Sequence, residues 1–245
     1  VTSTGGPFSY LYKNDGNGIM SKVLTGDIGD TSYNTGWGCA WADYDNDGHT
    51  DLIIAAANGF GTVFHPNRFL KNNGDGSFTR LEIHGLTDTL APFTVPTWSD
   101  YDQDGDMDLF IGSGPGGSTS TDFLYKNMLT ETGVADLVRL MTAPMATDQL
   151  DGQVWNWIDY DNDGDLDGFI TNYANNVPNN LYRNNIGVYE RMIAAQVGSI
   201  VSDIGAYLAN VWGDFDNDGD LDCFVTRDGG QQSRYYNNNG NGTFT

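Results

Sequence analysis

Four segments of the chain carry the same spacing of acidic residues. Each consists of aspartate, an aromatic residue, aspartate, any residue, aspartate, glycine, two further residues and aspartate, and the copies begin at Asp43, Asp100, Asp159 and Asp214. Positions 1, 3, 5 and 9 are thus carboxylates, and the glycine at position 6 permits a sharp backbone turn. Oxygen donors at this density suit a hard cation, above all Ca²⁺, which accepts about six to eight oxygens in flexible geometry.

We therefore predict four structural Ca²⁺ sites and no other cofactor. The predicted side-chain ligands occupy the same positions in every copy: Asp43, Asp45, Asp47 and Asp51; Asp100, Asp102, Asp104 and Asp108; Asp159, Asp161, Asp163 and Asp167; Asp214, Asp216, Asp218 and Asp222. Without a cation, four carboxylates on one short loop would repel one another, so a merely solvated turn is the weaker interpretation.

The spacing differs from that of an EF-hand calcium loop. An EF-hand needs a bidentate glutamate at position 12 and a helix on each side. Here position 12 is occupied by Ile54, Ile111, Ile170 and Val225, inside short runs of β-branched and aromatic residues. Each loop is therefore expected to lead into a buried β-strand.

The composition favours a folded all-β protein over an acidic tail. The formal charge is -22, but more than half of the 33 acidic residues lie in the four loops, which argues against a nucleic-acid partner. The 32 glycines favour tight turns, and no apolar run is long enough to span a membrane. Cys39 and Cys223 could pair or remain free.

A longer repeat surrounds each loop. The loop starts are 57, 59 and 55 residues apart, and a tryptophan stands two residues before every loop, at Trp41, Trp98, Trp157 and Trp212. A strand-like tetrad that ends in asparagine follows each loop, and a fifth copy begins at Leu11. This period and four strands per repeat predict propeller blades, with the in-phase tryptophans packing between them.

Other residues interrupt this regularity. Trp37 and Trp155 are out of phase with the repeat, so we expect them to be better candidates for ligand contact than the four in-phase tryptophans. The segment 137–145 is the nearest approach to a helix in the chain.

The compound motif resembles the FG-GAP/VCBS repeat of integrin-α-type β-propellers. The resemblance is carried over residues 8–245 by the aspartate loop, the apolar strand after it, the Leu-Tyr-x-Asn tetrad and turns such as Asn73-Gly-Asp-Gly76. It implies that calcium is held between the first two strands of a blade, with a backbone carbonyl from position 7 as a further ligand. Carried over, these carbonyls belong to His49, Asp106, Asp165 and Asp220.

We accordingly expect residues 1–245 to form one all-β domain, a β-propeller of four-stranded antiparallel blades or a portion of one. The expected blades cover approximately residues 35–83, 93–140, 152–193 and 207–245, after an open half-blade at residues 8–24. The half-blade lacks two strands. A longer chain, closure into a five-bladed ring, or strands from a neighbouring copy in a filament could each complete it.

The sequence nominates no catalytic residue. His49, His65 and His84 share no triad or zinc motif, and the paired carboxylates are committed to metal. We expect a non-enzymatic protein that is extracellular or on the cell surface, where Ca²⁺ is abundant enough to fill such sites. The resemblance implies adhesion to, or recognition of, a glycan or an extracellular protein. The alternatives are a self-assembling fibre subunit and, more remotely, a polysaccharide-lyase-like enzyme.

Overall fold

A computed structural model describes residues 10–23, 25–29, 36–56, 64–114, 120–174 and 177–245. Within them the protein is all-β, and the strands pair antiparallel. The three α-helices, α1 (Leu129–Thr132), α2 (Pro144–Thr147) and α3 (Ala194–Val197), have four residues each, and none of the described helices could cross a membrane. Residues 8, 9, 24 and 35, at the expected blade limits, lie outside the described residues.

Strands that follow one another in the chain pair into four successive sheets. The first sheet contains β3 (Gly38–Ala42), β4 (Asp51–Ala55), β5 (Arg68–Asn72) and β6 (Phe78–Leu81). The second contains β7 (Phe93–Ser99), β8 (Asp108–Ser113), β10 (Phe123–Asn127) and β11 (Leu137–Arg139). The third contains β13 (Gly152–Ile158), β14 (Asp167–Asn172), β15 (Asn180–Arg183) and β16 (Glu190–Arg191), and the fourth contains β17 (Tyr207–Gly213), β18 (Asp222–Arg227) and β19 (Arg234–Tyr236).

Smaller elements complete the described chain. An N-terminal hairpin joins β1 (Leu11–Gly16) to β2 (Ile19–Val23), β9 (Ser120–Thr121) pairs with β12 (Gln149–Leu150), and two 3₁₀ turns, η1 and η2, cover Asp27–Gly29 and Ser199–Val201. The fourth sheet has three strands, and the segment after them forms isolated bridges from Phe244 to Asn238 and to Gly198.

The segment 137–145, the nearest approach to a helix in the sequence, is a strand in its first part. Leu137–Arg139 forms the edge strand β11, whose pairing with β10 outweighs the helical tendency of so short a run, and helix begins only at Pro144. Cys39 and Cys223 lie in the first and fourth sheets, respectively, and both are free.

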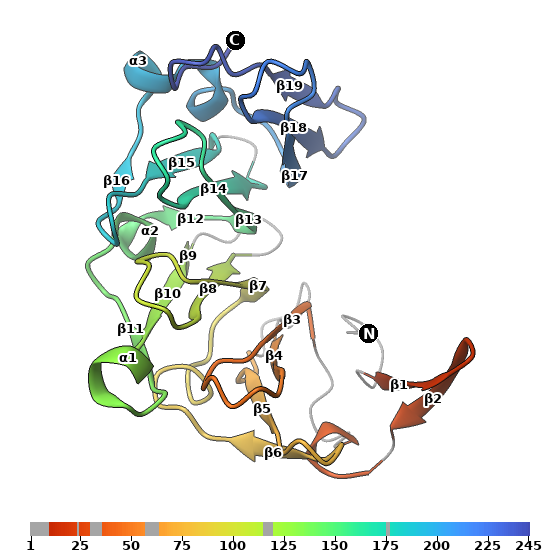
Figure 1. The fold of residues 1–245 in the computed structure, drawn as a ribbon. Helices are drawn as coiled ribbons and strands as arrows, with labels where there is room; N and C mark the ends of the chain where they lie inside the picture. Colours follow the sequence, from red (N-terminus) through yellow and green to blue (C-terminus); the bar gives the residue numbers. More distant parts are fainter. Residues whose placement is uncertain (1–9, 24, 30–35, 57–63, 115–119, 175–176) are drawn as a thin grey trace.

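The four sheets lie side by side in chain order along an open arc (Figure 1). The N-terminal hairpin lies at one end of the arc and the fourth sheet at the other. For each sheet we call the face toward the preceding sheet the leading face, and the face toward the next sheet the trailing face. The hairpin covers the leading face of the first sheet, where Leu11 and Val23 pack on Leu52, Ile54 and Leu70.

Apolar side chains fill the spaces between the sheets. Trailing-face and leading-face residues share a cluster at each of the three interfaces: Ile53 with Leu109, Phe110 with Ile170, and Phe169 with Val225. The in-phase tryptophans take part. The rings of Trp98, Trp157 and Trp212 lie 6.1, 6.4 and 5.2 Å from those of Phe69, Phe110 and Phe169, respectively. The assignment to packing between sheets is confirmed for these three, whereas Trp41 is 43% exposed and its ring lies 6.0 Å from that of Phe78 in its own sheet.

Trp155 is not a surface residue, contrary to the expectation of ligand contact. It is 3% exposed, and its ring stacks on Phe110 at 4.0 Å. The third repeat has Gly168 where the other repeats have a larger residue, and a Cβ there would lie 1.8 Å from the indole. Trp155 therefore fills the core volume that Gly168 leaves open.

Candidate metal centres

Each aspartate loop connects the first two strands of a sheet. We number them loop 1 (43–51), loop 2 (100–108), loop 3 (159–167) and loop 4 (214–222). Every loop turns through two left-handed residues, at positions 4 and 6. The φ angles at position 4 are 54° to 61°, at Asn46, Gln103, Asn162 and Asn217, and those of the position-6 glycines are 88° to 98°. A side chain at position 6 would be strained, which explains the glycine.

The first aspartate of each loop holds this turn together. In loop 1, Asp43 accepts hydrogen bonds from the backbone N–H groups of Asp47 and Gly48, both at 2.9 Å. The same two bonds recur in the other loops at 3.0 and 3.1 Å. The loop thus has a defined shape set by its own sequence.

The last aspartate of each loop is fully buried between strands. Asp51, Asp108, Asp167 and Asp222 are 0% exposed. One oxygen of each accepts a hydrogen bond from the backbone N–H of a tetrad asparagine at 2.7 or 2.8 Å. The other oxygen accepts from the N–H at position 2 of its own loop, at 3.1 to 3.4 Å.

Carboxylate oxygens converge in every loop. In loops 1, 2 and 3, one oxygen from each of positions 1, 3 and 9 lies within 4.8 Å of the others; in loop 4 positions 1, 3 and 5 do so. The aspartates at position 3 of the first three loops, Asp45, Asp102 and Asp161, each have a buried oxygen with no hydrogen-bond partner among the described residues. Buried carboxylate oxygens need a donor or a cation, so these residues fit a divalent ion.

Burial raises the pKa of the last aspartate in three loops. Desolvation is the largest cause, and it raises the pKa of Asp51 to about 6, of Asp167 to about 7 and of Asp108 to about 8. Neighbouring carboxylates add to the shift, and backbone hydrogen bonds oppose it. At neutral pH a bound cation would favour the ionised form of these side chains.

Lysines lie against the acids of the first two loops. Lys71 is ion-paired with Asp45 and, at 2.9 Å, with Asp47. Lys126 is ion-paired with Asp102 and with Asp104 at 3.0 Å, and it also contacts Glu131 of α1. Both lysines come from the third position of the tetrad, so the first two repeats each place a positive charge beside their own loop.

Loops 3 and 4 differ in this respect. The tetrad residue of the third repeat, Arg183, pairs with Glu190 at 3.0 Å, and that of the fourth repeat is Asn237. Among the described residues, no lysine or arginine forms an ion pair with loop 3 or loop 4. A cation bound in loop 3 or loop 4 would therefore not have to displace such an ion pair.

The structure does not bring every predicted ligand into one group. Asp104 groups instead with Asp106 and Glu131. The position-7 side chains have other partners: that of Asp106 accepts a hydrogen bond from the Thr130 N–H at 2.8 Å, and that of Asp165 accepts one from the Ile186 N–H at 3.0 Å. The position-7 backbone carbonyls, including that of His49, stay predicted ligands.

Two groups of residues beside the loops escaped the sequence reasoning. The tetrad asparagines recur in phase with the loops, and this recurrence is the sequence signal of their contact with the last aspartate of each loop. The position-4 residues Asn46, Gln103 and Asn162 reach the next loop, donating to Gly105 O at 3.3 Å, Gly164 O at 2.9 Å and an oxygen of Asp220 at 2.7 Å, respectively. No pattern within one repeat reveals a contact between repeats.

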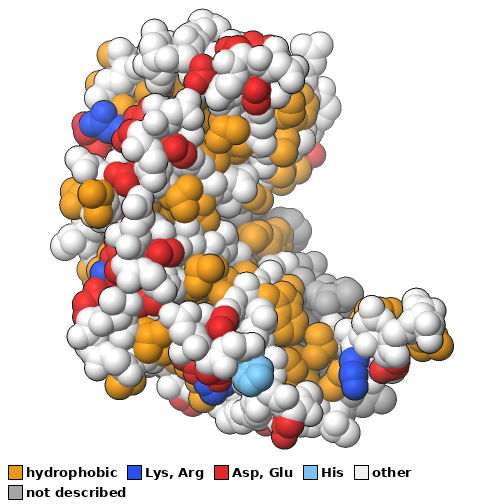
Figure 2. Space-filling view, in the orientation of Figure 1, with side chains coloured by type: hydrophobic (Ala, Val, Ile, Leu, Met, Phe, Trp, Pro, Cys, Tyr) orange, Lys and Arg blue, Asp and Glu red, His pale blue; other side chains and the backbone are white. Residues whose placement is uncertain are grey.

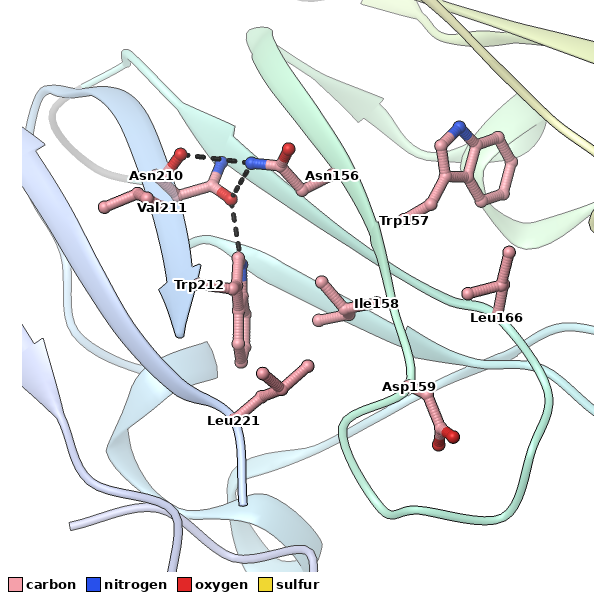
Figure 3. A pocket seen from close by; sticks show the side chains of 9 residues that line it. All are labelled: Asn156, Trp157, Ile158, Asp159, Leu166, Asn210, Val211, Trp212 and Leu221. Carbon is pink, nitrogen blue, oxygen red and sulfur yellow. Dashed lines mark hydrogen bonds between the residues drawn. The ribbon is translucent and has the colours of Figure 1, made fainter. Parts of the chain in front are cut away.

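A cleft of about 450 Å³ lies beside loop 3, between the first strands of the third and fourth sheets (Figure 3). Its lining includes the indole of Trp212 and the amides of Asn156 and Asn210, whereas the Trp157 ring points away from it, toward Tyr101 of loop 2. Asn156 donates to the side-chain oxygen of Asn210 at 2.6 Å, and the Trp212 indole N–H donates to the same oxygen at 2.9 Å. Asp159 of loop 3 also lines the cleft.

Repeated sheets with an acidic loop after the first strand define a class of all-β repeat protein. The family model described as FG-GAP-like repeat matches the chain at residues 1–54, 51–111 and 159–225. The chain belongs to the FG-GAP-like repeat family.

The chain is similar to part of each of two larger proteins. The chain is 25% identical over 182 residues to cartilage acidic protein 1 of Mus musculus, in a match that covers 73% of this chain and 27% of that protein. It is also similar to an Agrocybe aegerita lectin described as recognising non-reducing terminal N-acetylglucosamine. That likeness has a TM-score of 0.44 and 15% identity, covering 100% of this chain and 74% of the lectin chain.

Proposed function

We propose that the four sheets are blades of a β-propeller whose loops hold structural Ca²⁺. The convergence of carboxylate oxygens in all four loops carries this proposal. The unpartnered oxygens of Asp45, Asp102 and Asp161 support it, as do the raised pKa values of the buried aspartates. Side chains at positions 1, 3, 5 and 9 would hold the ion, which would neutralise their repulsion and stabilise the folded loop.

The ion count tests this part. Native mass spectrometry in Ca²⁺ should find four ions on the folded protein, and chelation should lower its melting temperature. A melting curve that is the same in Ca²⁺ and in EDTA would remove the claim that the ions are structural.

The protein's role, in this proposal, is recognition outside the cell without catalysis. The cleft beside loop 3 supports recognition, because it combines the Trp212 indole with two side-chain amides, a lining that suits the apolar face and hydroxyl groups of a sugar. Asp159 belongs both to the cleft and to the carboxylate group of loop 3. Ligand binding should therefore depend on Ca²⁺. The similarity to a protein named for cartilage supports an extracellular location.

A glycan array and a pull-down with extracellular proteins, each in Ca²⁺ and in EDTA, test this role. Asn156→Ala should weaken retention about tenfold, since it removes a cleft amide. Thr97→Ala, at the same register position in the second sheet, should leave retention unchanged. Equal retention in Ca²⁺ and EDTA, or equal effects of the two variants, would count against the cleft as the binding site.

A filament subunit is the second candidate. Within the described residues, strand β1 pairs only with β2, so its other edge is open to strands from another chain. Analytical ultracentrifugation over a range of concentrations distinguishes the candidates. A filament subunit should form a concentration-dependent series of heavier species, and a single monomeric species at all concentrations would exclude this candidate.

A further inference from the structure

Hydrogen bonds connect the last aspartate of one loop to that of the next. From loop 1 to loop 2, the Tyr44 N–H donates to Asp51 at 3.4 Å, and the Tyr44 carbonyl accepts from the side-chain amide of Asn127 at 2.7 Å. The backbone N–H of Asn127 then donates to Asp108 at 2.8 Å. Two candidate metal ligands, on different sheets, are thus joined through only two residues.

The same connection is repeated twice more. From loop 2 to loop 3 it passes from Asp108 through Tyr101 and Asn184 to Asp167, with distances of 3.3, 2.7 and 2.7 Å. From loop 3 to loop 4 it passes from Asp167 through Tyr160 and Asn238 to Asp222, with distances of 3.1, 2.8 and 2.8 Å. Since each inner aspartate uses one oxygen for each side, the chain of bonds is continuous across all four loops.

This chain of bonds is shielded from water. The four aspartates are 0% exposed, and Asn127, Asn184 and Asn238 are at most 1% exposed. Buried hydrogen bonds in series polarise one another, and no solvent competes for their partners. A change in the position or charge of one aspartate is therefore felt by the next asparagine and by the loop beyond it.

A second set of bonds runs alongside at the surface. Gln103 in loop 2 donates to Gly164 O and to the Asp165 side chain of loop 3, at 2.9 and 2.8 Å. Gln103 stands between the candidate ligands Asp102 and Asp104. A cation bound by Asp102 and Asp104 would therefore also restrain Gln103, whose side chain bonds to the turn of loop 3.

We propose that Asn127, Asn184 and Asn238 are positioning residues that couple neighbouring metal sites, so that an ion in one loop raises the affinity of the adjacent loops. The inference rests on the proposed function, because it concerns the ions proposed for these loops. An ion bound in one loop would order part of the adjacent loop, so that loop would lose less conformational entropy when it binds its own ion. The coupling is reciprocal. We expect a coupling of about three- to tenfold in affinity between neighbours, and none between loops that are not adjacent.

The chain contains a matched control residue. Asn72 has the same tetrad position, and its backbone N–H donates to Asp51 at 2.7 Å. Its side-chain amide donates to the position-8 carbonyl of its own loop, Thr50 O, as the amides of the other three asparagines also do. Unlike theirs, it has no preceding loop to reach among the described residues. Asn72→Ala should therefore disturb loop 1 alone, whereas Asn184→Ala should disturb the link between loops 2 and 3.

Calorimetric titration with CaCl₂ of two-site variants tests the coupling. An adjacent pair keeps loops 2 and 3 (Asp45→Ala with Asp216→Ala), and a separated pair keeps loops 1 and 3 (Asp102→Ala with Asp216→Ala). The second ion should bind three- to tenfold more tightly than independent sites predict in the adjacent pair, and independently in the separated pair. Independent binding in both pairs would overturn the proposal.

Asn184→Ala in the adjacent pair should weaken the coupling, leaving only the link through Gln103, while Asn72→Ala in the same background should preserve it. Equal coupling in the two variants would exclude Asn184 as a residue that couples the metal sites of loops 2 and 3. Circular dichroism checks that each variant folds, and the adjacent and separated pairs, which keep every asparagine, decide the question if Asn184→Ala unfolds. Four independent ions on the unmodified protein would overturn only the coupling, whereas no bound ion would overturn the proposed function itself.

Discussion

The second and fourth repeats carry the same motif in different surroundings. In the second, the trailing-face residues Tyr101, Phe110 and Leu124 are at most 1% exposed, because the third sheet covers them. In the fourth, the equivalent residues Phe215, Phe224 and Tyr235 are 50%, 37% and 46% exposed. Figure 2 shows apolar side chains at the surface over this end of the arc.

This difference shows where the stability of a repeat originates. The motif places apolar residues on both faces of every sheet, but their burial is supplied by the next sheet and not by the repeat itself. The fourth sheet's trailing face thus carries the same kinds of apolar residue as the other sheets, but among the described residues no further sheet packs on it. Four predictions follow from comparing the two repeats.

Truncation of an aromatic residue on the trailing face should give the largest contrast. Phe110→Ala leaves a cavity between the second and third sheets and should cost about 3–5 kcal/mol of unfolding free energy. Phe224→Ala, at the same position of the fourth sheet, should cost less than about 1 kcal/mol, since its ring is already partly in water. Urea denaturation in Ca²⁺ measures both. Equal losses would mean that the face of the fourth sheet is covered in solution.

Removal of one metal ligand should give the next largest contrast. Asp102→Ala and Asp216→Ala should each reduce the bound ions from four to three by native mass spectrometry. Losing a filled site lowers the unfolding free energy by about 2.7 kcal/mol when the Ca²⁺ concentration is a hundred times the dissociation constant. The loss should be larger for Asp102, because loop 2 is bonded to loops on both sides. Four ions on Asp102→Ala would show that its loop was misassigned.

The unfolding free energy of the Ca²⁺-free protein, measured in EDTA, should fall as pH rises. Burial raises the pKa of Asp108 to about 8, well above its ordinary value of 3.8, so the folded state holds a proton that the unfolded chain releases. Between about pH 4 and pH 8 the unfolded state is therefore increasingly favoured, and Asp51 and Asp167 act in the same direction.

Melting temperatures in EDTA should drop by roughly 10 °C from pH 5 to pH 8, since Asp108 alone accounts for about 3–4 kcal/mol of unfolding free energy over this range. Asp108→Asn, which removes the charge, should flatten this dependence. The Ca²⁺-saturated protein serves as the control and should lack the drop. A melting temperature in EDTA that rises over the same pH range would contradict the burial of an ionisable Asp108.

Changes at position 4 should give the smallest contrast. Gln103→Ala removes two exposed hydrogen bonds to loop 3 and should cost about 0.5–1 kcal/mol. Within the described residues, the Asn217 side chain makes no hydrogen bond, so Asn217→Ala should be neutral apart from the preference of asparagine for its left-handed backbone. Asn217→Gly, which keeps that backbone, checks this point by thermal melting.

The features repeated along the chain were predictable from its residues. The loops lie between the first two strands of each sheet, and Trp98, Trp157 and Trp212 pack between sheets, because both follow from periodicity and residue type. Exceptions to the repeat were harder to predict. Trp155 was misjudged because its burial depends on Gly168, thirteen positions later and on the paired strand.

Contacts between repeats could not be read from a single motif. Asn127 binds its own loop through its backbone and side chain, and the preceding loop through its side chain. Only the stacking of sheets brings Tyr44 within its reach. The ion pairs of Lys71 and Lys126 depend similarly on the curl of each loop toward its tetrad strand. The residue types were visible in the sequence, but their partners are determined by the packing.

The pairing of consecutive strands within each sheet affects how the chain can fold. Contacts within a sheet join residues close in sequence, so little chain entropy is lost in forming one of them. A single sheet, however, leaves both apolar faces in water until a neighbour forms. We therefore expect folding to nucleate at a pair of adjacent sheets and to spread sheet by sheet, and to be able to begin while later repeats are still being synthesised.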